Sequence, residues 1–187
     1  QGNGYYKNEG LLVITEGEIY TLNFMYRGNL VSAETIIPSK PQNLKASESS
    51  IVITPFDPGG GFGGGLPEFP DPIALTWDNP DQEYHVVVVA NIESDPDPIN
   101  EDQEEDFRPV FRNEPDQTNT YEVGFQSFEY YGNHRIVLFH ILPEYAALYD
   151  NTGNSSQNLS TPSSNVENGL GIFTGMHSDT LYVEVTQ

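Results

Sequence analysis

The residues best suited to chemistry in this 187-residue chain are oxygen donors gathered in one acidic segment. Residues 93–106 contain eight Asp or Glu side chains and no Lys or Arg. Five oxygen-bearing side chains lie close together there: Asp95, Asp97, Asn100, Glu101 and Asp102. Calcium prefers such ligands, so calcium is the one cofactor that the sequence suggests. Two prolines interrupt the segment and the central Gly of an EF-hand is absent, so a solvated loop without a metal stays the alternative.

Aromatic residues supply a second candidate site. Three of them follow one another closely: Phe128, Tyr130 and Tyr131. Exposed aromatic patches are uncommon without a partner, so these rings predict a glycan-binding surface if they reach solvent. The alternation of Tyr121, Val123 and Phe125 just before them is typical of a core face and favours burial instead.

Signatures of catalysis are missing from the sequence. The chain has no Cys, no Gly-x-Ser-x-Gly turn and no His-Glu-x-x-His pair. Four histidines lack the paired spacing of metal ligands, and packing is the alternative for them: His85, His134, His140 and His177. A glycosidase pair could be drawn from 28 carboxylates, but no motif singles one out. We therefore expect no enzymatic activity.

The charge of the chain narrows its partners. Acidic residues outnumber basic ones by 28 to 7, which gives a formal net charge of −21. Such a surface repels nucleic-acid phosphates and anionic lipid headgroups, so nucleic acid is excluded as a partner. Cations, neutral glycans and basic protein surfaces remain compatible. No apolar run approaches the roughly 20 residues of a membrane helix.

Short alternating segments predict strands throughout the chain. Residues 18–26 and 30–37 are expected to form a hairpin with a type II′ turn at Gly28-Asn29. The same dipeptide at Gly132-Asn133 predicts a second hairpin between residues 120–131 and 134–142.

The remaining segments complete the same pattern. Further strands are predicted at 44–54, 73–78, 84–92 and 179–186. Residues 84–92 are apolar on both faces, as in a central strand covered on both sides. One short helix is predicted at 143–150 from its N-terminal proline. The six glycines between 59 and 65 predict a surface loop over 57–68.

These elements favour an all-β, antiparallel sandwich with one short helix. Leu75-x-Trp77 and Tyr84-x-Val86-x-Val88 resemble strands B and C of a fibronectin type III-like, immunoglobulin-like sandwich. That resemblance places Trp77 and Tyr84 in the core, so we expect both to be buried between two sheets.

A broader resemblance covers most of the chain. Four stretches are similar to the domain of unknown function 4249 family of Bacteroidetes envelope proteins: residues 17–22, residues 32–38, the Trp77 and Tyr84 strands, and Asn165 to Phe173. This family implies lipoproteins with an immunoglobulin-like N-terminal domain, often encoded beside TonB-dependent transporters. The lipid-bearing Cys of that pattern is not in this chain, so any membrane attachment would depend on an anchor outside it.

The resemblance implies a domain organisation and a location. Residues 1–38 would be the C-terminal strands of an N-terminal immunoglobulin-like β domain, and residues 39–187 the fibronectin type III-like sandwich. The expected protein is a non-catalytic, extracytoplasmic accessory or ligand-binding module at the outer membrane or cell surface. Its partner would be an envelope protein or glycan, with a TonB-dependent transporter as one candidate. A calcium-stabilised adhesion-like domain and a glycan-processing enzyme stay open as alternatives.

Overall fold

A computed structural model of the chain describes residue 10 and residues 12–54, 69–100, 110–149 and 163–187. The glycine-rich loop predicted at 57–68 lies outside these described residues, as do Glu101 and Asp102. Strands dominate what is described, and the fold is all-β. Its elements are β1 (Ile19–Tyr26), β2 (Asn29–Ile36), β3 (Gln42–Ala46), β4 (Ser50–Val52), β5 (Ile73–Asp78), β6 (Tyr84–Asn91), β7 (Phe111–Arg112), β8 (Thr120–Val123), a 3-10 turn (Phe125–Ser127), β9 (Gly132–Ile141), α1 (Pro143–Ala146) and β10 (Met176–Thr186).

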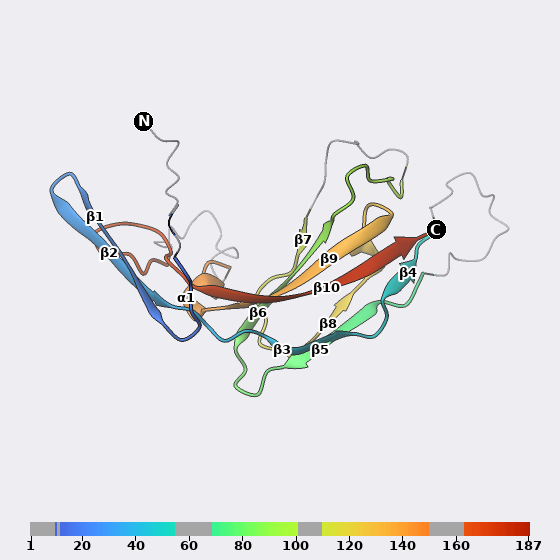
Figure 1. The fold of residues 1–187 in the computed structure, drawn as a ribbon, viewed down its shortest axis with the longest axis horizontal. Coiled ribbons are helices and arrows are strands. Elements are labelled where there is room, and N and C mark those ends of the chain that lie inside the picture. The colour runs from blue at the N-terminus through green and yellow to red at the C-terminus, as the bar shows by residue number, and fades with distance from the viewer. Residues whose placement is uncertain (1–9, 11, 55–68, 101–109, 150–162) are drawn as a thin grey trace, which may run out of the picture.

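The strands form two sheets of a sandwich and a separate hairpin. One sheet has the order β3-β5-β8 and the other the order β4-β10-β9-β6-β7. Neighbouring strands are antiparallel except β4, which runs parallel to β10. Strands β1 and β2 pair only with each other among the described strands, and this hairpin extends from one end of the sandwich (Figure 1).

Alternation within the strands builds the core. Buried residues of β5, such as Leu75 and Trp77, pack in one cluster with buried residues of the opposite sheet, such as Val87, Leu138 and Val183. Apolar side chains of both sheets thus face each other, which confirms the predicted sandwich. Strands β5 and β6, predicted to be strands B and C, lie in opposite sheets, as these two strands do in an immunoglobulin-like sandwich.

The apolar character of β6 on both faces has a structural cause. Its inward residues join the sandwich core, while Val86 on the other face packs with Ile141 and with Ala146 of α1. The prediction of a strand covered on both sides is confirmed. The helix is also confirmed, although α1 is shorter than the predicted span because it ends at Ala146.

One of the two predicted core aromatics lies elsewhere. Trp77 is buried between the sheets with 5% of its surface exposed, as predicted. Tyr84 is half-buried and packs on the outer cluster with Val86 and Ile141, so the prediction that it lies between the sheets is wrong. The reason is the register of β6, whose inward positions are His85, Val87 and Val89.

Both predicted Gly-Asn turns are also wrong. Because Tyr26 pairs with Asn29, the first turn consists of Arg27 and Gly28, with φ of 50° and 86°. Positive φ at both central positions makes it a type I′ turn. At the second position Gly132-Asn133 lies inside β9 and pairs with β10. Strand β8 pairs with β5 in the other sheet, so residues 124–131 cross between the sheets.

Candidate binding surface

Backbone hydrogen bonds hold the first half of the acidic segment in place. The backbone carbonyl of Asp97 accepts a hydrogen bond of 2.8 Å from the Tyr131 amide, and the Ile99 amide donates one of 2.9 Å to the Glu129 carbonyl. Ile99 is buried and anchors the turn, whereas Asp95, Asp97 and Asn100 are exposed. Among the described residues no three His, Asp or Glu side chains converge in a way that could hold a metal. Calcium binding here stays a prediction, since two of the five proposed ligands lie outside the described residues.

The aromatic cluster next to this segment faces inward. Phe128 and Tyr130 are only 5% and 2% exposed, and Tyr131 is half-buried with its hydroxyl donating to the Ile53 carbonyl at 3.0 Å. These rings fill the end of the core beneath residues 97–99, so they do not form an exposed platform for sugars. Their burial agrees with the alternative that these rings pack in the core, and not with the predicted glycan-binding surface.

Glu93, at the beginning of the acidic segment, binds the start of β9. One oxygen of Glu93 accepts hydrogen bonds from the backbone amide and the side-chain amide of Asn133, at 2.7 and 2.8 Å. These bonds hold the pKa of Glu93 below its usual value. The neighbouring His134 is buried, and its burial lowers its pKa. The polar side chains of Glu93, Asn133 and His134 at this end of the sandwich therefore serve packing and internal hydrogen bonds.

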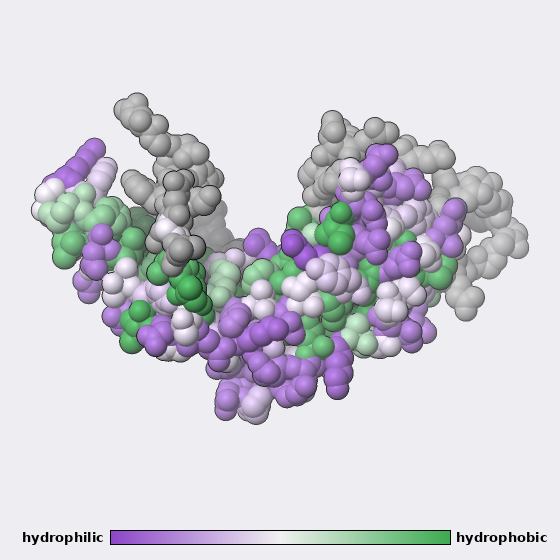
Figure 2. Space-filling view, in the orientation of Figure 1, coloured by the Kyte–Doolittle hydropathy of each residue, from purple (hydrophilic) through white to green (hydrophobic). Residues whose placement is uncertain are grey.

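The hairpin presents a different kind of surface. Six of its apolar side chains are exposed: Ile19, Phe24, Met25, Tyr26, Leu30 and Ile36. Hydrophobic residues gather over it at the left of the molecule (Figure 2). Residues 19–33 contain no Asp or Glu, and Arg27 is their single charge. Five of these six exposed side chains, all but Ile36, therefore lie on a stretch without acidic residues in a chain of net charge −21.

The hairpin is held against the segment that leads into β10. Glu167 exchanges backbone hydrogen bonds of 2.8 and 3.3 Å with Ser32, and the Asn168 amide side chain donates to the Leu30 carbonyl at 2.9 Å. The Gly175 amide donates to the Thr35 hydroxyl at 2.8 Å. These contacts bury Val31 and leave the tip of the hairpin exposed.

Local features of this segment explain its shape. Asn165 binds both backbone groups of Phe173, accepting from its amide at 2.8 Å and donating to its carbonyl at 2.7 Å. Asn168 and Gly171 have φ of 55° and 141°, conformations that Asn and Gly tolerate. Gly171 thus serves the backbone geometry of the segment, and Asn168 does so while its side chain also binds the hairpin. Phe173 itself is half-buried.

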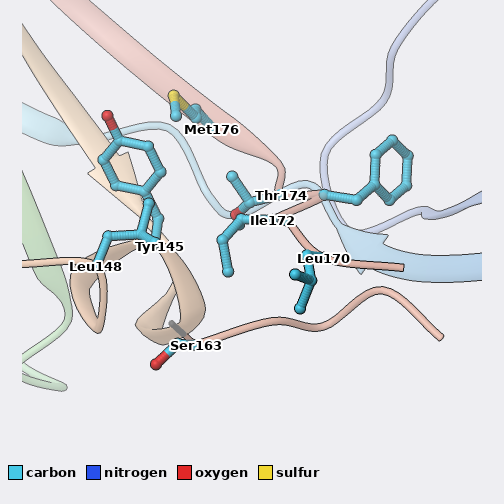
Figure 3. A pocket seen from close by; sticks show the side chains of 9 residues that line it. Tyr145, Leu148, Ser163, Leu170, Ile172, Thr174 and Met176 are labelled. Carbon is cyan, nitrogen blue, oxygen red and sulfur yellow. The ribbon is translucent and has the colours of Figure 1, made fainter. Parts of the chain in front are cut away.

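An apolar groove lies between α1 and the same segment. Its volume is about 570 Å³, and its lining includes Tyr145, Leu148, Leu170, Ile172 and Met176 (Figure 3). This volume is in the range of small-ligand sites, although the groove is open to solvent on one side. Leu170 of the groove lies two residues after Asn168, whose side chain binds the hairpin. The same short segment therefore contacts the hairpin and lines the groove.

Comparison with known protein families, with curated proteins and with solved structures finds no match to this chain. None of the described helices is long and apolar enough to span a membrane.

Proposed function

We propose that this chain is a non-catalytic binding or accessory module of a bacterial cell envelope, and that the β1–β2 hairpin is its contact surface. The observation that carries this proposal is the exposed apolar surface of the hairpin, whose residues 19–33 contain no Asp or Glu, in a strongly acidic chain. Aromatic residues, Met and Arg are enriched at the centre of protein interfaces, and Asp and Glu are depleted there. Phe24, Met25, Tyr26 and Arg27 match that composition.

The partner that fits is another β-rich protein surface or strand. Strand β2 is bound by Glu167 and Asn168 of the same chain, and a further strand or a packed face would stabilise a hairpin of only two strands. A second copy is disfavoured, because two bodies of charge −21 repel each other. The resemblance to envelope lipoproteins motivates an outer-membrane or cell-surface location, with the partner being a transporter such as a TonB-dependent protein. It also motivates the assignment of residues 1–38 to a preceding immunoglobulin-like domain.

The absence of catalysis is part of the proposal. Support comes from the sequence, which lacks an activated nucleophile motif, and from the packing of the histidines that a base would require. His85, His134 and His140 are all buried within the sandwich. A calcium-stabilised adhesion domain stays the second candidate, because Asp95, Asp97 and Asn100 are exposed on a pinned turn.

The test compares capture by three versions of the chain. Wild type, a variant with Phe24→Ser, Met25→Ser and Leu30→Ser, and a control with Val52→Ser, Val110→Ser and Tyr182→Ser would be incubated with detergent-solubilised envelope of the source cell. The control positions are also exposed but lie on the sandwich. The proposal expects one envelope protein that the wild type and the control retain and the hairpin variant loses. Equal retention by all three would contradict it.

A further inference from the structure

Strand β1 has a strand partner on one side only. Its full length, Ile19–Tyr26, pairs with β2 in a register without a bulge, and these two strands form a sheet of their own among the described strands. The other side of β1 is a sheet edge, along which backbone N–H and C=O groups project away from the hairpin. The geometry of the turn determines which residues carry these groups.

Alternation along the hairpin identifies the residues concerned. Tyr26 and Asn29 flank the two-residue turn, so they form a hydrogen-bonded pair, as the first and last residues of a β-turn do. Hydrogen-bonded and non-hydrogen-bonded pairs alternate in an antiparallel ladder. The backbone groups of Thr21, Asn23 and Met25 therefore point away from β2, and we call these three the outward residues of β1.

The edge of β2 that does not face β1 supports this assignment. The same alternation directs the backbone of Leu30 and Ser32 away from β1. Both residues do bind outside the hairpin, since Ser32 exchanges backbone hydrogen bonds with Glu167 and the Leu30 carbonyl accepts one from Asn168. The outward residues of β1 have no such backbone partner within the described part of the chain.

The edges of the sandwich, by contrast, have features that prevent the addition of a strand. Strands β4 and β7, at the edges of the five-stranded sheet, are three and two residues long. In the other sheet the register of β3 is irregular between Gln42 and Lys45, and β8 has four residues and carries the exposed Glu122. Short length, irregularity and charge protect natural sheet edges. Strand β1 has none of these features, because it is eight residues long and regular and contains no charged residue and no Pro.

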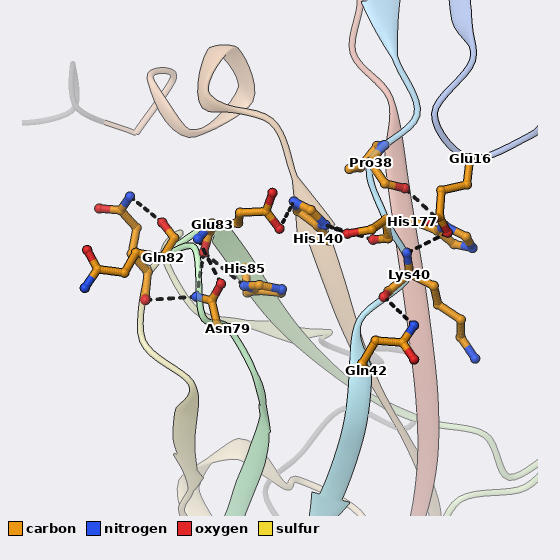
Figure 4. A network of polar contacts seen from close by, with 12 residues as sticks. Glu16, Pro38, Lys40, Gln42, Asn79, Gln82, Glu83, His85, His140 and His177 are labelled. Carbon is orange, nitrogen blue, oxygen red and sulfur yellow. Dashed lines mark hydrogen bonds and ion pairs between the residues drawn. The ribbon is translucent and has the colours of Figure 1, made fainter.

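Contacts at the base of the hairpin hold β1 in position. The carboxylate of Glu16 accepts a hydrogen bond of 3.0 Å from the Lys40 amide and lies 3.5 Å from Nδ1 of His177 in β10 (Figure 4). The Gly17 amide donates to the Ile37 carbonyl at 2.9 Å. Together with the bonds along β2, these contacts fix the hairpin to the sandwich. The edge of β1 is therefore preorganised, which lowers the entropic cost of binding.

Charged side chains at the two ends of β1 give this edge a direction. Glu18 lies just before the strand and Arg27 just after it, both are exposed, and no charged residue lies between them. An antiparallel neighbour would begin beside Arg27 and end beside Glu18. Opposite charges on neighbouring strands stabilise their pairing. The complementary strand therefore has an acidic residue at its N-terminal end, a basic residue at its C-terminal end and an uncharged stretch between them.

We propose that the partner of this chain adds an extended strand of that composition, antiparallel, to the edge of β1 and so completes a three-stranded sheet. This inference rests on the proposed function and specifies how the hairpin binds. Backbone hydrogen bonds from the outward residues supply affinity, and contacts with alternate side chains, such as the exposed Phe24 and Tyr26, supply specificity. A second copy of the chain is disfavoured as the source of the strand by its net charge of −21.

Residue-resolved hydrogen exchange of the full chain tests this pairing with two synthetic peptides. The first is Asp-Thr-Val-Thr-Val-Thr-Val-Thr-Val-Lys with blocked ends, and the second has its Asp and Lys exchanged. At about ten times its Kd, the first peptide should slow exchange of the outward amides by roughly tenfold. The second should bind more weakly. Amides of Leu22 and Phe24, which point towards β2, should be protected already in the free chain. No slowing by the first peptide at roughly 1 mM would overturn the proposal.

Two substitutions at one position separate backbone pairing from side-chain contact. Asn23→Pro removes an N–H that the β1–β2 ladder does not use, and Pro is tolerated at such edge positions. Asn23→Thr changes the side chain but keeps the amide. The Pro variant should bind the first peptide about tenfold more weakly, because one backbone hydrogen bond is lost, whereas the Thr variant should bind as wild type does. Unchanged protection of Leu22 and Phe24 would show that the hairpin is intact in the Pro variant. Equal binding by the two variants would overturn the proposal.

Other occupants of the edge would give different results. Protection of the outward amides in the free chain that rises with protein concentration would assign the edge to a second copy, and protection at every concentration would show that the chain covers the edge itself. Either result would overturn the proposal. Failure of the proposed function is a separate outcome, because it appears as loss of envelope capture by wild type. Capture by Asn23→Pro that equals capture by wild type would contradict the edge pairing alone.

Discussion

Ser32 and Glu167, which are 135 residues apart in the sequence, are joined by two backbone hydrogen bonds and by a side-chain bond of 2.9 Å from the Ser32 hydroxyl to the Glu167 carboxylate. Through this pair the edge of β2 that does not face β1 is bound to the segment that leads into β10. The hairpin is consequently fixed to the sandwich here as well as through residues 37–41, which join it to β3.

Gly175 should be the position at which this attachment is most sensitive to substitution. A Cβ atom there would lie 2.1 Å from the Ile36 carbonyl oxygen, which is backbone and cannot move away cheaply. We expect Gly175→Ala to destabilise the protein by about 1–3 kcal/mol, as other overpacking substitutions do. Gly124→Ala is the control, because its Cβ would meet only a side-chain atom at 3.4 Å. Urea denaturation of both variants measures the difference, and equal stabilities would argue against the close approach.

Trp77 and Tyr84 should differ in what they contribute to stability. Trp77 lies between the sheets, so Trp77→Ala should cost about 3–5 kcal/mol through the cavity it leaves. Tyr84 is half-buried on the outer face, and Tyr84→Ala should cost roughly half as much. Denaturant midpoints of the two variants check this order. A larger loss for Tyr84→Ala would show that the register of β6 is not the one described.

Buried His85 should contribute an acid-sensitive component of stability. Its pKa is about 4 in the folded chain, because of burial and then the charge of His140, against an ordinary value of 6.5 in the unfolded chain. The unfolded state therefore binds more protons between these values, and stability present above about pH 6.5 is lost as the pH falls towards 4. The loss amounts to at most about 3 kcal/mol.

Replacing His85 isolates that component. His85→Gln should lower stability at pH 7 but should flatten the fall between pH 6.5 and 4, although His134, whose pKa burial also lowers, keeps part of it. Urea midpoints measured at several pH values give both curves. Parallel curves for wild type and variant would show that His85 does not titrate in this range.

Calcium should raise the melting temperature if residues 95–102 form the predicted site. The effect should be seen near 1 mM calcium, since extracellular calcium modules bind at roughly 0.1–1 mM. Asp95→Asn with Asp97→Asn should remove it, and neither change disturbs the backbone bond from the Tyr131 amide to the Asp97 carbonyl. Asp71→Asn, remote in sequence from that segment, is the control. An unchanged melting temperature in wild type would end the calcium alternative.

Much of the sandwich was predictable because its signals are local. The unbroken apolar run of β6 indicated a strand covered on both sides, and Pro143 marked the first turn of α1. Leu75 and Trp77 alternated with polar residues, as a half-buried strand requires. Such patterns report which face of an element is buried, and they need no knowledge of its neighbour.

Pairing and register were not predictable in the same way. Gly132-Asn133 has the composition of a turn, yet it continues β9 because its partners are Val185 and Glu184 of β10. His85, His140 and His177 lie at directly opposed positions of β6, β9 and β10, and their spacing in the sequence gave no sign of this because it depends on how three strands align. The lack of acidic residues at 19–33 is visible in the sequence. The exposure of its apolar side chains is visible only in the structure, where β1 and β2 form a sheet of their own.

The most direct test of the central claim is a photocrosslinking amino acid placed at Met25 of the hairpin or at Tyr182 of β10, in protein produced in the source cell. The two side chains are equally accessible, with 65% and 61% of their surfaces exposed. If the hairpin is the contact surface, irradiation should join the Met25 position to one envelope protein of defined mass and leave the Tyr182 position largely uncrosslinked. Crosslinks to that protein from Tyr182 alone, or none from either position, would contradict the account.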